Sequence, residues 1–165
     1  MQKFVVNGGR RLSGSLKVQG SKNSALPILA ATLLVKGKSV IHNVPTLSDT
    51  ICTLKILKAL GCKVYREGNT VFVDNENAFG YEIPEDLMRE MRSSVVFLGA
   101  ILGRFGKATI SSPGGCEIGL RPIDLHVYAM RRLGVSVNES FGKLVCTTKD
   151  YLKGEKITFS FPSVG

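Results

Sequence analysis

SALPILAATLLVKG (residues 24–37) and SSVVFLGAILGRFG (residues 93–106) share one layout: a serine, an apolar run of helical length, and a closing glycine. A short strand candidate follows each stretch, at residues 39–41 and 108–110. Such apolar runs predict helices that are buried on most sides. The first and last residues of the two stretches are offset by the same 69 positions (93 − 24 and 106 − 37). We therefore interpret them as two copies of one unit.

The likeness continues past these strands with a second, amphipathic helix and two short alternating strands in each copy. The second helices, expected at 47–60 and 122–133, both close with Leu-Gly, and a glycine just past a helix is a C-cap signal. The last strands are expected at 63–66, 71–73, 135–137 and 143–146. The sequence therefore predicts an α+β fold in which a helix–strand–helix–strand–strand unit occurs twice.

The second copy is longer than the first in one loop. Gly61 and Gly134 are offset by 73 positions (134 − 61), four more than the leading glycines of the two copies. The extra residues fall within 111–121, between the first strand and the second helix. An insertion confined to one loop of a repeated scaffold favours a functional loop, and a neutral insertion is the alternative.

The longer loop places a cysteine among glycines, in the run Pro113-Gly114-Gly115-Cys116-Glu117-Ile118-Gly119. Glycine lets the backbone approach a ligand closely. Because Arg121 follows nearby, we expect the Cys116 thiol to have more thiolate character than an isolated cysteine. Such a thiol can act as a nucleophile or as a general acid. An incidental surface thiol is the alternative.

The starts of the apolar helices are candidate anion sites, since helix N-termini present unpaired N–H groups and a positive dipole end. Under the repeat, these starts are Lys22-Asn23-Ser24, Arg92-Ser93-Ser94 and Ser163-Val164-Gly165. Pseudosymmetry would bring them together in one anion-binding rim; ordinary solvated charges are the alternative. Asp124, on the first turn of a second helix, stabilises the helix dipole or accepts hydrogen bonds from a ligand.

The repeat also suggests how the chain is divided. Residues 1–21 contain two strand candidates, 4–6 and 15–18, ahead of the first copy. Residues 22–165 read as the first two units of a three-unit domain, because a third copy begins at Ser163, offset by 70 positions from Ser93 (163 − 93). We therefore expect the chain to be truncated inside this domain.

Composition narrows the function classes. The net charge is +9, from 22 basic and 13 acidic residues, yet the basic residues are spread along the chain, tryptophan is absent and aromatic residues make up 7%. This favours a surface that handles phosphate groups over one that binds nucleic acid. Nucleic-acid binding would predict an affinity for DNA or RNA that falls steeply with salt concentration. No apolar run reaches membrane-spanning length and no signal peptide is recognisable, so we expect a cytoplasmic protein.

The other cysteines have a simpler interpretation. No C-x-x-C pair is present, so neither a zinc site nor a redox motif is indicated, and disulfides are not expected in the cytoplasm. Cys52, Cys62 and Cys146 fall in apolar segments and are expected to be small buried side chains.

Four motifs together resemble the UDP-N-acetylglucosamine 1-carboxyvinyltransferase family of enolpyruvyl transferases. These are KNSALP (22–27), RSS (92–94), PGGCEIG (113–119) and RPIDLH (121–126). The resemblance implies an inverse α/β barrel fold of two domains, each of three βαβαββ-type units, with residues 1–21 pairing with the second domain. It implies transfer of the enolpyruvyl group of phosphoenolpyruvate to the 3′-hydroxyl of UDP-N-acetylglucosamine, the first committed step of peptidoglycan synthesis. No metal or organic cofactor is implied.

The same resemblance implies roles for individual residues. Lys22 would hold phosphoenolpyruvate, Asn23 would sit between the two substrates, and Arg121 would meet the anionic substrate. Cys116 would deliver a proton to the methylene carbon and can form an adduct with phosphoenolpyruvate. The residues implied to line the UDP-sugar site are Arg92, Arg121, Pro122, Ile123, Asp124, Leu125, Ser163, Val164 and Gly165. Some members carry a basic residue just before the Ser-Val-Gly turn, where this chain has Phe161 and Pro162.

Two alternatives to this function stay open at the level of sequence. One is a related transferase acting on shikimate phosphate, which does not normally carry the Gly-Gly-Cys loop. The other is a non-catalytic fragment that binds a UDP-sugar or another anion. Because the C-terminal part of the enzyme would be its necessary partner, we expect residues 1–165 alone to be inactive.

Overall fold

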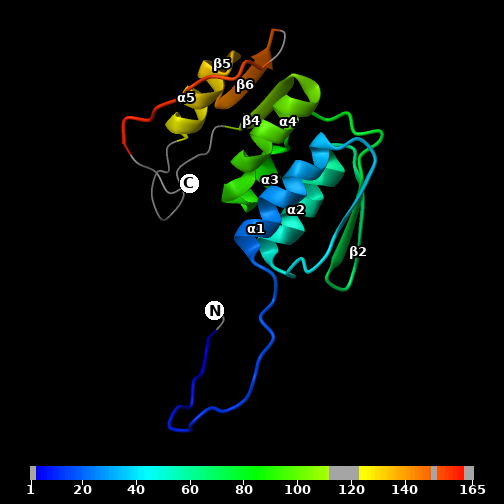
Figure 1. The fold of residues 1–165 in the computed structure, drawn as a ribbon, viewed down its shortest axis with the longest axis vertical. Helices are drawn as coiled ribbons and strands as arrows, with labels where there is room; N and C mark the ends of the chain where they lie inside the picture. The colour runs from blue at the N-terminus through cyan, green and yellow to red at the C-terminus, as the bar shows by residue number, and fades with distance from the viewer. Residues whose placement is uncertain (1–2, 112–122, 150–151, 162–165) are drawn as a thin grey trace.

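The computed structural model describes residues 3–111, 123–149 and 152–161, and it contains the repeated unit in both copies (Figure 1). The first copy comprises α1 (Lys22–Ala31), the 3₁₀ helix η1 (Thr32–Leu34), β1 (Lys38–Ile41), α2 (Ser48–Ala59), β2 (Lys63–Glu67) and β3 (Thr70–Asp74). The second comprises η2 (Arg92–Val96), α4 (Phe97–Phe105), β4 (Lys107–Ser111), α5 (Asp124–Arg132), β5 (Val135–Ser140) and β6 (Lys143–Thr148). A short helix, α3 (Glu85–Glu90), lies between the copies.

The two copies form two three-stranded antiparallel sheets with the same topology. Their strand orders are β1-β3-β2 and β4-β6-β5, so the last strand of each copy is central. Lys38 pairs with Asp74 in the first sheet, and Lys107 pairs with Thr147 in the second. The partners are offset by 69 (107 − 38) and 73 (147 − 74) residues, the two offsets found in the sequence. The predicted repeat is confirmed, with its extra residues between β4 and α5.

One backbone contact recurs where each sheet meets its leading helix. The N–H of Asn75 donates to the carbonyl of Gly37 at 3.0 Å, and the N–H of Thr148 donates to the carbonyl of Gly106 at 2.8 Å. Both glycines have left-handed backbones, with φ of 113° and 68°, which favours glycine over other residues. The shared glycine is therefore required by backbone geometry, and it marks the end of the buried helix in each copy.

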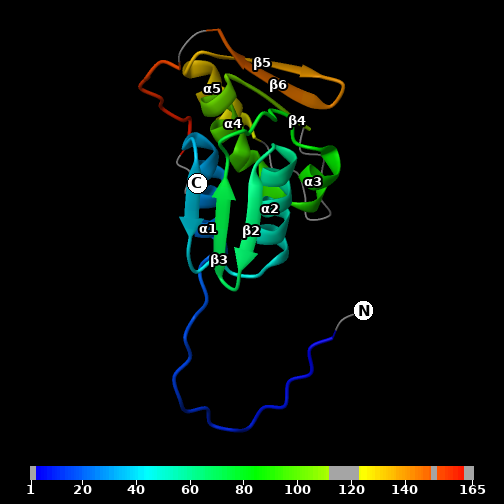
Figure 2. The ribbon, with the colours of Figure 1, turned by 90° about the vertical axis from the view of Figure 1, so that its right-hand side faces the viewer.

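The leading helices form the centre of the core. Figures 1 and 2 show α1 beside α2 and α4, with the first sheet covering one side of α1 and α2. The core between these elements includes the fully buried side chains of Leu29, Leu33, Leu57 and Ile101. Leu57 of α2 and Leu60, the residue after the helix, are buried, while Lys55 and Lys58 are exposed, as the amphipathic pattern predicts.

The expectation that both leading helices are buried on most sides is only partly correct. On α4 most apolar residues are buried, including Phe97 and Ile101. On α1 and the residues after it, Ile28, Leu34 and Val35 stay about half exposed, at 48%, 53% and 57%. The physical reason is that the described part of the chain packs α2 and α4 against α1 and leaves its third side open.

The helix α3 was not predicted from the sequence. It begins after Pro84, carries Glu85 in its first turn, and buries Leu87 and Met88 against the core. At six residues it is too short to show a helical period, and its burial depends on packing against α2 and β4. The helix adds an ion pair from Glu90 to Lys55 of α2 at 3.0 Å.

The N-terminal arm, residues 3–20, extends away from the body in Figures 1 and 2. The strands expected at 4–6 and 15–18 are not formed there, because a strand requires a hydrogen-bonded partner and none lies beside the arm in the described residues. Its large apolar side chains are exposed, namely Phe4, Val5, Val6, Leu12, Leu16 and Val18. Pairing of residues 1–21 with a second domain remains a prediction.

Asn75 is a buried polar residue on which the first copy depends, and its replacement by alanine is expected to destabilise the fold. Its Oδ1 accepts from the Gly37 N–H at 2.9 Å, and its Nδ2 donates to the buried carbonyl of Thr32. Asn75→Ala leaves the Gly37 N–H without its acceptor and removes one of two donors to the Thr32 carbonyl, which keeps the Val35 N–H at 3.3 Å. The free energy of unfolding should therefore fall by about 1–3 kcal/mol in urea denaturation. Asn138→Ala, at an exposed position of β5, is the matched control and should change it by less than about 0.5 kcal/mol. Equal losses would contradict the role given to Asn75.

Candidate active site

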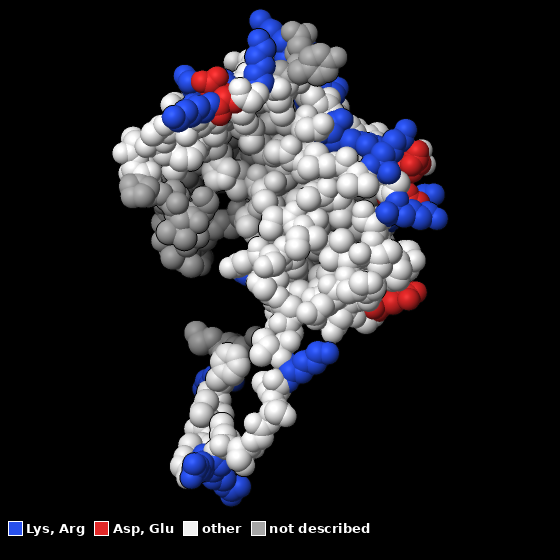
Figure 3. Space-filling view, in the orientation of Figure 1, with Lys and Arg blue, Asp and Glu red and all other residues white. Residues whose placement is uncertain are grey.

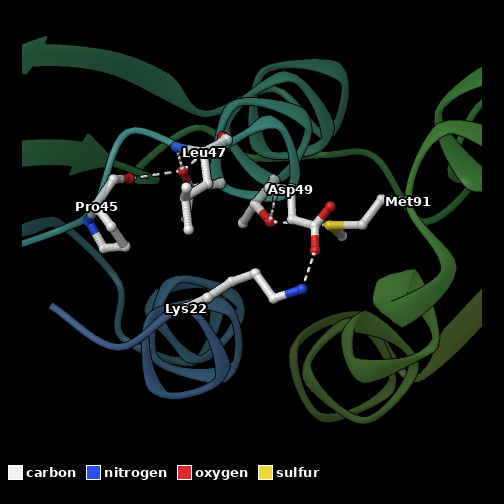
Figure 4. Close-up of polar contacts among 7 residues, drawn as sticks. Lys22, Pro45, Leu47, Asp49 and Met91 are labelled. Atoms are coloured by element: carbon white, nitrogen blue, oxygen red, sulfur yellow. Dashed lines mark hydrogen bonds and ion pairs between the residues drawn. The ribbon is translucent and has the colours of Figure 1, made fainter. Parts of the chain in front are cut away.

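Lys22 is the first residue of α1, and its side chain reaches across to α2 (Figure 4). Its Nζ lies 2.7 Å from Oδ2 of Asp49, with the two side chains 44% and 27% exposed. Ser21 makes no side-chain cap and α1 has no acidic residue in its first turn, so no side chain of α1 itself neutralises this helix start. An ammonium group has three donors. The pair with Asp49 occupies one of them, which leaves donors for a ligand at the start of α1.

Asp49 is held in place by the first turn of α2. The Thr50 hydroxyl lies 2.7 Å from the carbonyl of Pro45 and accepts a hydrogen bond from the N–H of Leu47 at 3.1 Å (Figure 4). These bonds satisfy backbone groups that a helix start otherwise leaves unpaired. Thr53, one turn further on, donates to the Asp49 carbonyl at 2.8 Å. The Asp49 carboxylate therefore lies on a helix end that several hydrogen bonds hold in place.

Thr53 of α2 also contacts the second copy of the repeated unit. The Thr53 hydroxyl is 3.3 Å from Sδ of Met91, a residue only 1% exposed that directly precedes Arg92 at the start of η2. Helix α1 also packs against η2. The N-terminal half of α2 therefore contacts Lys22 at the start of α1, through Asp49, and Met91 just before η2, through Thr53. The anion-binding rim expected from Lys22, Asn23, Arg92 and Ser163 remains a prediction.

The remaining predicted site residues lie elsewhere or outside the described residues. Asn23 is exposed on the first turn of α1. Asp124 opens α5 with Ile123 and Leu125 on either side, and Figures 1 and 2 show α5 with the second sheet, away from where the arm enters α1. Outside the described residues are Cys116, Arg121, Pro122, Ser163, Val164 and Gly165. Their roles remain predictions.

The three other cysteines are buried, as predicted, and are poor nucleophiles. Burial raises the pKa of Cys52 to about 11, with a further contribution from the nearby Glu90 carboxylate. Burial raises the pKa of Cys62 to about 11 and also raises that of Cys146, although an arginine beside each opposes the effect. Near neutral pH these thiols stay protonated.

Two polar residues of this region were given no role from the sequence: Asp49 was not singled out, and Ser94 was named only as part of a helix start and a motif. Asp49 has only the sequence signal of an acid in a helix first turn, because its pairing with Lys22, 27 residues away, depends on how α1 packs on α2. Ser94, on η2, is 1% exposed, and its Oγ has no hydrogen-bond partner among the described residues. Only its place two positions after Arg92 in the repeat could have drawn attention to it.

The distribution of surface charge and of metal-binding groups is known for the described residues only. Figure 3 shows lysine and arginine side chains scattered over one face and the tip of the arm, without a single dense patch. Among the described residues, no group of three or more His, Cys, Asp or Glu side chains could hold a metal ion. Within that same part of the chain, every helix is too short or too polar to cross a membrane.

The sequence and the fold match a known class of protein. The chain belongs to the EPSP synthase (3-phosphoshikimate 1-carboxyvinyltransferase) family, whose model matches residues 6–165. The solved enolpyruvyl transferase NikO from Streptomyces tendae superposes with a TM-score of 0.74 at 27% identity, covering 88% of this chain and 32% of NikO. These matches confirm the resemblance, and the α+β fold is that of enolpyruvyl transferases.

The curated relatives that the chain resembles are UDP-N-acetylglucosamine 1-carboxyvinyltransferases. The chain is 50% identical over its whole length to UDP-N-acetylglucosamine 1-carboxyvinyltransferase 2 of Caldanaerobacter subterraneus subsp. tengcongensis. It is 46% identical, again over its whole length, to UDP-N-acetylglucosamine 1-carboxyvinyltransferase of Chloroherpeton thalassium. The chain spans 39% of the length of each relative.

Proposed function

We propose that the protein containing this chain transfers the enolpyruvyl group of phosphoenolpyruvate to the 3′-hydroxyl of UDP-N-acetylglucosamine and releases phosphate. The observation that carries this proposal is the 50% identity, across all 165 residues, to a relative named for UDP-N-acetylglucosamine carboxyvinyl transfer. Because the chain spans 39% of that relative, the activity belongs to the full-length protein. Its place would be peptidoglycan synthesis in the cytoplasm, and through the cell wall it would support cell shape and division.

The start of α1 is suited to the phosphoenolpyruvate part of this reaction. Phosphoenolpyruvate carries a phosphate and a carboxylate, and both are stabilised by cations and by the free N–H groups of a helix start. Lys22 supplies the cation at the first residue of a ten-residue helix, and its side chain is 44% exposed. Asn23 follows it on the exposed side of the same turn, where we place it between the two substrates.

The protein supplies the proton chemistry through Cys116. As the 3′-hydroxyl loses its proton to a base and its oxygen attacks the central carbon of phosphoenolpyruvate, the methylene carbon must gain a proton, and a positioned thiol can donate it. When the C–O bond to phosphate then breaks, the same carbon loses a proton and the C=C bond of the enolpyruvyl group is restored. Arg121 would meet the anionic substrate beside it, and closure of the glycine-rich loop would exclude water. The high pKa values of the buried cysteines support Cys116 as the reacting thiol.

The UDP-sugar would bind along the second copy and the segment after it. The residues that we assign to this subsite are Arg92, Arg121, Pro122, Ile123, Asp124, Leu125, Ser163, Val164 and Gly165. Of these, Arg92 opens η2 beside Met91, and Asp124 opens α5. A second domain, paired with residues 1–21, would complete the site.

The proposed function is tested by product formation in the full-length protein. With phosphoenolpyruvate and UDP-N-acetylglucosamine, we expect release of one phosphate for each enolpyruvyl-UDP-sugar identified by its mass. Residues 1–165 alone should yield no product. Shikimate 3-phosphate in place of the UDP-sugar is the control acceptor, because the family model is described by that substrate. Turnover only with shikimate 3-phosphate, or with neither acceptor, would refute the proposal.

A further inference from the structure

We propose that Asp49 is a positioning residue for Lys22: its carboxylate holds the Lys22 ammonium at the start of α1, ready for the phosphate of phosphoenolpyruvate. This inference rests on the proposed function and deepens it, since no role has so far been given to Asp49. The carrying observation is the 2.7 Å contact between Lys22 Nζ and Asp49 Oδ2 (Figure 4).

This ion pair is more sheltered than the other lysine–carboxylate pairs of the described residues. The Asp49 side chain is 27% exposed, whereas the carboxylates of Glu76, Glu82 and Glu90 in their pairs are 52%, 50% and 42% exposed. Fully exposed pairs contribute little, because water screens the charges and both side chains stay free to move. A more sheltered carboxylate interacts more strongly with its partner. The pair is therefore suited to fixing a long, flexible lysine side chain.

Asp49 is held by more contacts within the fold than Lys22 is. Asp49 stands on the first turn of α2, where Thr53 binds its carbonyl at 2.8 Å and also contacts Met91 at 3.3 Å. Lys22 stands at the end of the extended arm, at a helix start with no capping side chain. The rigid partner is thus the carboxylate, and it fixes the ammonium relative to the start of η2 as well as to α1.

A carboxylate beside a cation can help or hinder anion binding. In the two cases, removing the carboxylate charge changes the affinity for the anion in opposite directions. If Asp49 positions Lys22, removing its charge weakens phosphoenolpyruvate binding, because the ammonium loses its fixed place. If Asp49 competes with the ligand for Lys22, removing its charge strengthens binding. We infer positioning, since one of the three ammonium donors is used by Asp49 and the lysine side chain remains 44% exposed.

The test is the dissociation constant for phosphoenolpyruvate, measured by titration calorimetry on the full-length protein. Asp49→Asn keeps the shape of the side chain and removes its charge. We expect the dissociation constant for phosphoenolpyruvate to rise about 10- to 100-fold while that for UDP-N-acetylglucosamine stays unchanged. The matched control is Glu82→Gln, which breaks a pair of 2.6 Å to Lys143, a lysine about as exposed as Lys22 whose carboxylate partner is more exposed than Asp49. This variant should change neither constant.

A double-mutant cycle separates positioning from a general loss of structure. If Asp49 acts through Lys22, Asp49→Asn should weaken binding no further in a Lys22→Gln background. Full additivity, unchanged binding in Asp49→Asn, or tighter binding would each overturn the inference. The product assay reports separately on the proposed function: protein that binds phosphoenolpyruvate without forming product refutes that function, while the Asp49→Asn comparison still decides this inference. Wild-type protein that fails to bind phosphoenolpyruvate overturns both.

Discussion

Replacing Cys116 with alanine in the full-length protein is expected to lower kcat for enolpyruvyl transfer by about 10²- to 10⁴-fold. The methyl group of alanine cannot donate the proton that the methylene carbon needs as the 3′-oxygen attacks. Substrate binding relies on cations and helix starts, so KM for both substrates should change far less than kcat. Steady-state phosphate release, with UDP-N-acetylglucosamine and phosphoenolpyruvate each varied in turn, gives both parameters.

The matched control for this variant is Cys62→Ala. Cys62 is 6% exposed, and its pKa is raised to about 11 by burial, so it has no thiolate to contribute near neutral pH. The control should retain kcat within about twofold, with at most a modest loss of stability on removing one buried sulfur atom. A Cys116→Ala protein with wild-type kcat, or a Cys62→Ala protein with the larger loss, would contradict the assignment of the proton donor.

Ile56→Ala should be the most destabilising simple truncation in α2. Ile56 is fully buried in the core between the helices and the first sheet. Truncation to alanine removes buried methyl and methylene groups and leaves a cavity, which costs about 2–5 kcal/mol of unfolding free energy. Urea denaturation of the full-length protein, followed by circular dichroism, measures the loss.

Ile51→Ala is the control because it removes the same atoms from the same helix. Ile51 is 43% exposed, so its loss should cost about 1 kcal/mol or less. The comparison tests the burial pattern of α2 on which the positions of Asp49 and Thr53 depend. Equal destabilisation by both variants would mean that α2 does not present this face to the core.

Most of the fold could be predicted because each copy carries its own local signals. Gly61 and Gly134 lie just past the second helices with φ of 92° and 94°, a conformation that glycine adopts readily. The registers Lys38↔Asp74 and Lys107↔Thr147 reproduce the sequence offsets. In contrast, the short helix α3 depends on packing against other elements, and its six residues are too few to show a helical period of apolar residues.

The candidate site was predictable only as far as the repeat reaches. The repeat drew attention to Lys22 and Arg92 near the starts of the two leading helices, and the structure places Met91, the residue before Arg92, in contact with Thr53 of α2. Asp49 could not be found in this way, since a contact across 27 residues follows from helix packing and not from a local pattern. The roles of Cys116 and the other residues outside the described ranges stay predictions.

A crystal structure of the full-length protein with phosphoenolpyruvate and UDP-N-acetylglucosamine tests most directly whether the helix starts and the cysteine loop form one site. We predict the phosphate of phosphoenolpyruvate within hydrogen-bond distance of Lys22 Nζ, with Asp49 still bound to that ammonium and the Cys116 sulfur beside the methylene carbon. A structure in which the ligand lies away from Lys22, or in which Cys116 faces the opposite side of the domain, would contradict this account.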